Sequence, residues 1–153
     1  MKIKEAGKRV ETKEKYLPTD DEIAAILDNV NERYRALTSL MLHHGLRIGE
    51  AIALERDDVR VEHQPGAPLP RVTVRVKQNA QRISGKGGTY MLVQPPKTKA
   101  GYRDVPIMAA DVPIFLEHLE KYAPTSSTVV QTSEGERSAV LFTVTNAGRM
   151  VMD

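Results

Sequence analysis

Arg47 is the cationic side chain whose neighbours in the sequence could hold it in place for chemistry. An apolar helical pattern over residues 37–42 ends at Gly45, two positions before the arginine. Glycine tolerates the left-handed backbone that commonly ends a helix, so the sequence predicts a tight turn between two helices here. Glu50 follows one helical turn later, where its carboxylate can orient a guanidinium confined by apolar neighbours. Spacing alone also allows an ordinary structural Arg–Glu pair.

A long stretch without acids is the second cationic feature. Residues 71–103 contain eight basic side chains and no Asp or Glu, although the net charge of the chain is only +2. The eight are Arg71, Arg75, Lys77, Arg82, Lys86, Lys97, Lys99 and Arg103. Such a stretch in a nearly neutral protein predicts a surface that faces a polyanion. A solvated basic hairpin without a partner is the alternative.

The elements around these cations predict an α+β fold that is mainly helical, with a small three-stranded antiparallel sheet. Thr19 and Glu22 form a capping-box pattern before an apolar stripe over 23–30, and further helices are expected at 34–44, 48–54 and 111–122. Alternating β-branched and basic residues predict strands at 71–77, 89–94 and 103–107. Residues 1–15 are expected to be a linker or arm, and residues 16–153 a single domain.

Several classes of protein are excluded by what the sequence lacks. There is no cysteine, so a disulfide framework, a cysteine metal site and a cysteine nucleophile are absent. The four histidines have no metal-ligand spacing, and no apolar run approaches the length of a membrane span. These features predict a soluble, cytoplasmic protein that uses no metal and no cofactor.

Two segments resemble one known family. Residues 45–54, Gly-Leu-Arg-Ile-Gly-Glu-Ala-Ile-Ala-Leu, look like the first catalytic-arginine box of the tyrosine recombinases, the phage-type integrases. Residues 97–107, Lys-Thr-Lys-Ala-Gly-Tyr-Arg-Asp-Val-Pro-Ile, are similar to the family's hairpin-lysine segment. The two occur in the family's order, a helix pair and then a sheet.

The resemblance implies roles for individual cations. Arg47 would bind the scissile phosphate with Glu50 orienting it, and Lys97 would protonate the departing 5′ oxygen, with Lys99 as the second candidate. The side chains expected to contact duplex DNA are Arg75, Lys77, Lys86, Lys99 and Arg103. Lys86 superficially resembles another variant of the hairpin lysine, but no Arg-x-Val-Pro strand follows it, so it is not assigned that role.

Residues 44–47 also spell the His-x-x-Arg of the family's second box. That box would be followed within a few dozen residues by a His or Trp box and a nucleophilic tyrosine. Here a proline-rich loop and a basic hairpin follow instead, as they do after the first box. We therefore expect His44 to be a helix-end residue rather than a catalytic one.

No residue of this chain matches the family's nucleophile. The five tyrosines, none in the expected C-terminal context, are Tyr16, Tyr34, Tyr90, Tyr102 and Tyr122. The resemblance therefore implies that residues 16–153 are the N-terminal half of a recombinase catalytic domain, without the second and third boxes. The complete protein would break and rejoin DNA strands through a 3′-phosphotyrosine. This part alone is expected to bind DNA weakly and not to cut it.

The expected partners are double-stranded DNA and, in the full-length protein, other recombinase protomers. The apolar stripes over 23–30 and 112–119 would normally share a core with the second half. We therefore expect the fragment to form a homodimer or to swap elements between copies, which would cover this exposed apolar surface. Two other functions fit parts of the sequence. One is a non-catalytic DNA-binding or regulatory protein that uses the basic β-hairpin; the other is a structural α+β interaction module without DNA affinity.

Overall fold

The computed structural model describes residues 14–85, 88–123, 145–146 and 149–150. Its helices are α1 (Asp20–Asn29), α2 (Glu32–Leu42), α3 (Ile48–Ile52) and α4 (Val112–Lys121), with short 3-10 helices η1 (Arg56–Asp58) and η2 (Lys99–Gly101). Its strands are β1 (Val59–Glu62), β2 (Arg71–Val76), β3 (Asn79–Gly85), β4 (Gly88–Gln94), β5 (Arg103–Pro106), β6 (Thr145–Asn146) and β7 (Arg149–Met150). Lys86, most of the expected arm and the apolar run over 139–144 lie outside the described residues.

The helix starts follow from local capping chemistry. The Thr19 hydroxyl accepts the Glu22 backbone N–H at 3.3 Å, and the Glu22 carboxylate accepts the Thr19 N–H at 2.8 Å. The predicted capping box is thus confirmed. The predicted turn is confirmed as well, because Gly45 has φ +67° and separates α2 from α3.

The central sheet has the strand order β1-β2-β5, and both pairings are antiparallel. The α+β fold class is confirmed, but the sheet differs in its strands from the prediction. The segment predicted as its second strand along the chain, 89–94, instead belongs to β4, which pairs with β3 in a separate two-stranded ribbon. The third strand of the sheet is β1, in a segment where the sequence predicted no strand. Neither β1 nor β3 shows a long alternating pattern, so their pairing depends on the rest of the fold.

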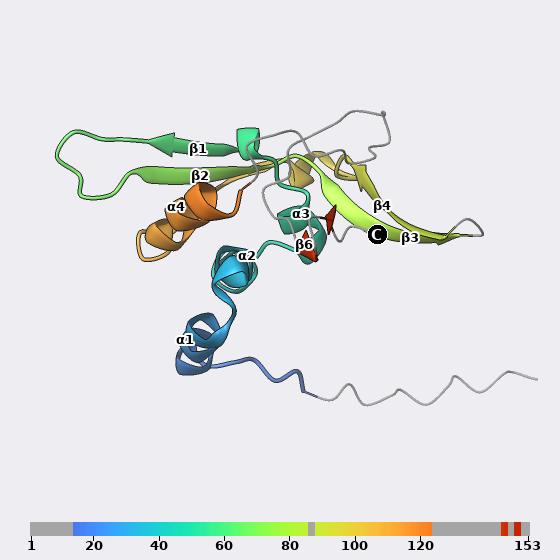
Figure 1. Ribbon diagram of the computed structural model, residues 1–153, viewed down its shortest axis with the longest axis horizontal. Helices are drawn as coiled ribbons and strands as arrows, with labels where there is room; N and C mark the ends of the chain where they lie inside the picture. Colours follow the sequence, from blue (N-terminus) through green and yellow to red (C-terminus); the bar gives the residue numbers. More distant parts are fainter. Residues whose placement is uncertain (1–13, 86–87, 124–144, 147–148, 151–153) are drawn as a thin grey trace, which may run out of the picture.

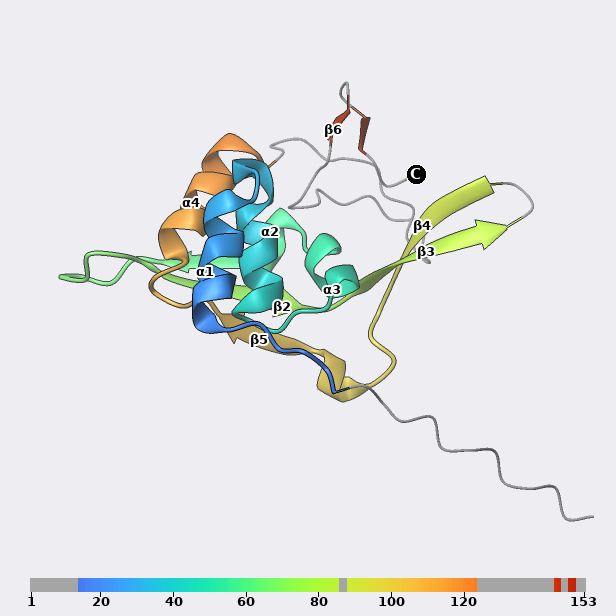
Figure 2. The ribbon, with the colours of Figure 1, turned by 90° about the horizontal axis from the view of Figure 1, so that it is seen from below.

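All four helices lie on one side of the central sheet, and the β3–β4 ribbon extends beyond its end (Figures 1 and 2). The core forms between this face and the helices. From β2 it contains Val72, Val74 and Val76, which are almost completely buried, as are Leu40 of α2 and Phe115 of α4. Alternation along β2 places its arginines on the opposite, open face of the sheet.

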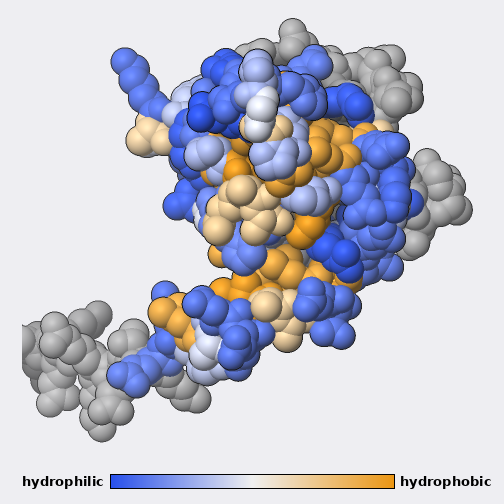
Figure 3. Space-filling model, turned by 90° about the vertical axis from the view of Figure 1, so that its left-hand side faces the viewer, coloured by the Kyte–Doolittle hydropathy of each residue, from blue (hydrophilic) through white to orange (hydrophobic). Residues whose placement is uncertain are grey.

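The apolar stripes over 23–30 and 112–119 were both expected to leave apolar surface exposed in this chain. This expectation is wrong for the second stripe. The α4 stripe is not left exposed, because Val112 and Phe115 are buried in the core of this chain and Leu119 packs partly against it. In α1, by contrast, Leu27 is the buried residue, and Ile26 remains 44% exposed. In Figure 3, hydrophobic residues reach the surface in the lower part of the molecule, where α1 lies, and in the region directly above it.

Candidate functional site

Arg47 is the residue immediately before α3, and its side chain points into solvent. Its backbone is extended (φ −71°, ψ 150°), and its side chain is 87% exposed. The expectation of a guanidinium confined among apolar neighbours is therefore wrong. The turn restrains the backbone of Arg47, while the long side chain extends away from the helix pair. The Nη1 atom lies 3.9 Å from the nearer carboxylate oxygen of Glu50, at the outer limit of an ion pair.

Glu50 is buried and has a different main partner from the one predicted. Its two carboxylate oxygens accept hydrogen bonds from both terminal nitrogens of Arg103, at 3.0 and 2.8 Å. One of them also accepts the backbone N–H of Arg47 at 2.9 Å. The hydrogen bonds with Arg103 are the main cause that lowers the pKa of Glu50, and the same bonds with Glu50 are the main cause that raises the pKa of Arg103. Glu50 therefore orients the backbone of Arg47 and binds the guanidinium of Arg103.

Two further cations predicted to bind DNA are paired with acids from outside the acid-free stretch. Arg75 forms two hydrogen bonds with Asp104, at 2.9 and 3.4 Å, across β2 and β5. Lys77 lies 3.2 Å from Glu55 and 2.9 Å from Asp58. Burial alone would lower the pKa of Lys77, but these carboxylates outweigh it and the pKa is raised. DNA contact by these cations stays a prediction, but their charge is largely balanced within the fold.

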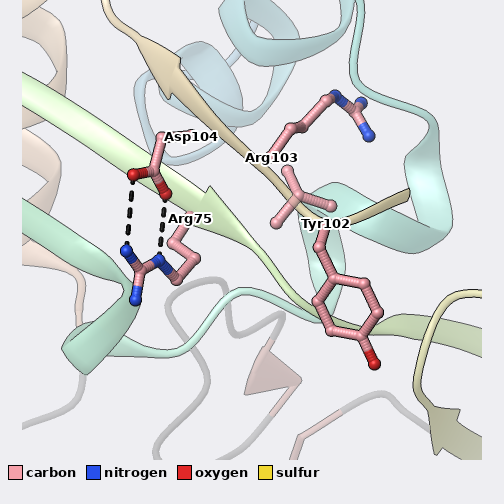
Figure 4. Close-up of a pocket in the computed structure, with 5 residues that line it drawn as sticks. Arg75, Tyr102, Arg103 and Asp104 are labelled. Atoms are coloured by element: carbon pink, nitrogen blue, oxygen red, sulfur yellow. Dashed lines mark hydrogen bonds and ion pairs between the residues drawn. The ribbon is translucent and has the colours of Figure 1, made fainter. Parts of the chain in front are cut away.

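Figure 4 shows that two neighbouring residues of β5 point to opposite sides of the sheet. Asp104 and Arg75 face each other on the open side of the sheet, while Arg103, the residue before Asp104 in β5, points the opposite way. These three residues line a shallow cavity of about 360 Å³. Tyr102 also lines it, and half of the Tyr102 surface is exposed. Strand alternation therefore sends two neighbouring charged residues to different partners on different faces.

Arg47 and Lys97 line one cavity, although they are far apart in the sequence. The cavity has a volume of about 460 Å³ and lies between α3, the base of the β3–β4 ribbon and the segment that leads into η2. Glu50 contributes to its wall, and Lys97 is exposed. Lys99 is exposed too, but it begins η2 and is not part of this wall. The fold thus unites the two motif cations and separates the two candidate lysines.

Amide side chains complete the cavity, and the motifs did not point to them. They are Gln78, Asn79, Gln81 and Gln94. The Gln78 amide donates to the Ala53 carbonyl at 2.7 Å and to the Glu55 carboxylate at 2.6 Å, which ties the start of the ribbon to the end of α3. No local pattern in the sequence marks these amides, since their role depends on the pairing of β3 with β4.

His44 lies outside this cavity and has both ring nitrogens engaged. Its Nδ1 is 3.1 Å from the Ser39 carbonyl, and its Nε2 accepts the Met108 backbone N–H at 3.0 Å. These contacts suit the predicted helix-end residue. Among the described residues, no group of three or more His, Asp or Glu side chains could hold a metal ion. No helix in this part of the chain is long and apolar enough to cross a membrane.

The comparisons with known proteins agree with these features. The model of the phage integrase family matches residues 17–143, which include both motif segments. This chain belongs to the phage integrase family. No curated protein sequence matches the chain.

Solved structures with a similar fold include integrases of the transposon Tn1549. Two complexes with circular intermediate DNA have TM-scores of 0.65 at 20% and 21% identity and cover 89% of this chain. A complex with transposon right-end DNA has a TM-score of 0.65 at 20% identity and covers 90% of this chain. The matched region is 40–41% of each integrase, so this chain spans less than half of their length.

Proposed function

We propose that this chain is the part of a tyrosine recombinase catalytic domain that holds one phosphate-binding arginine and the general acid. The observation that carries the proposal is the shared cavity of Arg47 and Lys97. An exposed guanidinium can bind two non-bridging phosphate oxygens, and an ammonium on a flexible stem can reach a neighbouring ester oxygen. The family membership and the DNA complexes of the similar Tn1549 integrases support double-stranded DNA as the substrate.

In this reaction a tyrosine, supplied by a part of the recombinase outside this chain, gives its hydroxyl proton to a base that is likewise supplied from outside this chain. The tyrosine oxygen attacks the scissile phosphorus. The new bond joins phosphorus to the tyrosine oxygen, and the bond from phosphorus to the 5′ oxygen breaks. Lys97 gives its proton to that departing oxygen, while Arg47 stabilises the negative charge on the phosphate. Rejoining runs the same steps in reverse. The complete enzyme would act in the cytoplasm with other recombinase protomers on the DNA.

The first experiment measures binding of this chain to duplex DNA over a range of salt concentrations. Wild-type protein should bind weakly, and Arg47→Ala should reduce the slope of log affinity against log salt by about one, because one phosphate contact is lost. Arg60→Ala is the matched control, since Arg60 is exposed on the open face of the sheet, away from the cavity. Equal effects of the two variants would contradict the proposal.

A second experiment separates the two lysines and tests the chemistry. In a complete recombinase that contains this segment, Lys97→Ala should slow strand cleavage by about 100-fold or more and change binding little. Lys99→Ala should affect cleavage much less, because Lys99 lies outside the cavity wall. A uniform loss of binding with unchanged cleavage would instead favour a non-catalytic DNA-binding role for the basic segment. A covalent adduct formed by this chain alone would contradict the proposed division of the site.

A further inference from the structure

We propose that Arg103 is a positioning residue that prevents Glu50 from pairing with the guanidinium of Arg47. The sequence suggested two separate roles, with Arg103 bound to DNA and Glu50 bound to Arg47. The geometry points instead to one arrangement, in which Arg103 holds Glu50 so that Arg47 remains available to an anion in the cavity. The inference rests on the proposed function only for the identity of that anion.

The two arginines compete for the same carboxylate. Both terminal nitrogens of Arg103 lie within 3.0 Å of the Glu50 oxygens, whereas the closest approach of Arg47 is 3.9 Å. The Arg103 side chain is 35% exposed and the Glu50 side chain 9%, against 87% for Arg47. A two-point hydrogen bond in a partly buried place is stronger than a single exposed contact, so Arg103 is the preferred partner.

Glu50 would interfere with anion binding if it were left unpaired. Its carboxylate belongs to the wall of the cavity that contains Arg47 and Lys97, so an uncompensated negative charge there would repel a phosphate. A buried carboxylate without a partner also attracts any cation within reach. The flexible side chain of Arg47 already lies close to it, so loss of Arg103 should draw the Arg47 guanidinium onto Glu50.

The pair also joins the two segments that carry the motif cations. Glu50 accepts the backbone N–H of Arg47 at the start of α3, and Arg103 is the first residue of β5, directly after the segment with Lys97 and η2. One ion pair therefore fixes the arginine turn against the lysine segment. Arg75 and Asp104 form a matched pair between β2 and β5, but they lie on the open face of the sheet and outside this cavity.

The test uses the whole chain with three substitutions, two of which are also combined in a double variant. Arg103→Met removes the charge and keeps an apolar stem, and Glu50→Gln keeps an oxygen that can accept the Arg47 N–H. The double variant Arg103→Met with Glu50→Gln lacks both charges, which also removes the buried unpaired carboxylate that could prevent folding. Arg75→Met is the control for loss of a paired arginine, because Arg75 lies on the neighbouring strand β2 and pairs with Asp104 of β5. Circular dichroism checks that each variant folds.

The first measurement needs no DNA. Nitrogen-detected NMR of the Arg47 side chain should show a freely rotating guanidinium in the wild type and slowed rotation in Arg103→Met, because Glu50 then binds it. Rotation should be fast again in the double variant and unchanged in Arg75→Met. A guanidinium of Arg47 that rotates freely in Arg103→Met would overturn the inference. If the single variant does not fold, Arg103→Lys, which keeps a charge without the two-point geometry, should show an intermediate effect; no effect would overturn the inference.

The second measurement is the salt dependence of binding to a duplex of mixed sequence. Arg103→Met should weaken binding about tenfold and lower the salt slope by about one, and the double variant should regain both. If Arg103 contacts DNA directly, the double variant would stay as weak as the single one, which overturns the inference. Absence of wild-type binding would count against the proposed function, while the NMR measurement would still decide the role of Arg103.

Discussion

Glu50 is the residue through which the arginine turn and the lysine segment meet. Its oxygens receive one backbone N–H from Arg47 and two guanidinium N–H groups from Arg103, so a single carboxylate restrains both segments. A conservative change at this position therefore affects geometry on both sides of the cavity. The contact also couples the stability of the site to pH, since only the ionised carboxylate can bind both arginines fully.

We expect acid to weaken this part of the fold through Glu50. Arg103 lowers the pKa of the folded-state carboxyl below its ordinary value of 4.5. The stabilisation is therefore present above that value and is lost as the pH falls through the lowered folded-state pKa. The melting temperature of Glu50→Gln should fall less than that of wild type between neutral pH and about pH 3. Glu120→Gln is the control, because Glu120 is exposed on α4, and its melting temperature should follow that of wild type. If the melting temperature of Glu50→Gln also fell in parallel with wild type, the coupling would be refuted.

At the scale of elements, α3 is held against β3 by an unusually close backbone contact. A Cβ atom on Gly49 would lie 2.3 Å from the side-chain oxygen of Asn79 and 2.6 Å from the carbonyl oxygen of Ala80. Only glycine allows this approach, which brings Arg47 beside the base of the β3–β4 ribbon. Figure 2 shows α3 next to that end of the ribbon. The cavity wall therefore depends on a small residue within the arginine motif.

Gly49→Ala should separate α3 from β3 and destabilise the chain by about 1–3 kcal/mol, as overpacking commonly does. The Asn79 side chain can rotate away, but the Ala80 carbonyl belongs to the backbone of β3 and cannot. Urea unfolding measures the loss, and Gly85→Ala is the matched control because a Cβ there has no atom within 4 Å. If Gly49→Ala and Gly85→Ala have equal free energies of unfolding, the close contact of Gly49 with β3 does not contribute to stability.

At the scale of the whole molecule, the helices cover one face of the sheet and α1 lies at the outer edge of that layer (Figure 1). The main packing of α1 is against α2, and a hydrophobic surface remains around it. Tyr16 and Leu17 are 75% and 80% exposed just before this helix. Exposed apolar groups gathered at one end of a domain are typical of a contact surface.

We propose that a second copy of this chain covers the α1 surface. Light scattering over a range of protein concentrations should detect a dimer at the highest concentrations, because burying apolar side chains favours association. Ile26→Glu should keep the chain monomeric by placing a charge in that surface. Asp28→Ser, on the same helix but at a polar exposed position, should leave the dimer unchanged. A wild-type monomer at every concentration would exclude this partner.

The sequence by itself determined the features that depend on neighbouring residues. The capping box at Thr19, the glycine turn before Arg47 and the strand predicted at 71–77 each follow from a short pattern. The structure confirms them, with the strand ending one residue earlier, at Val76. The two motif segments could also be recognised from the sequence, because their residues lie close together along the chain. Family and fold class followed from them.

Only the tertiary structure decided which charges meet. Arg103 binds Glu50, Arg75 binds Asp104, and Lys77 lies between Glu55 and Asp58, so a stretch without acids in the sequence is well supplied with acids in space. Each partner comes from another element, and strand alternation sets the face on which the two can meet. From local spacing, the sequence predicted Glu50 as the partner of the Arg47 guanidinium. The fold supplied a stronger competitor from β5, and Arg47 remains exposed beside Lys97.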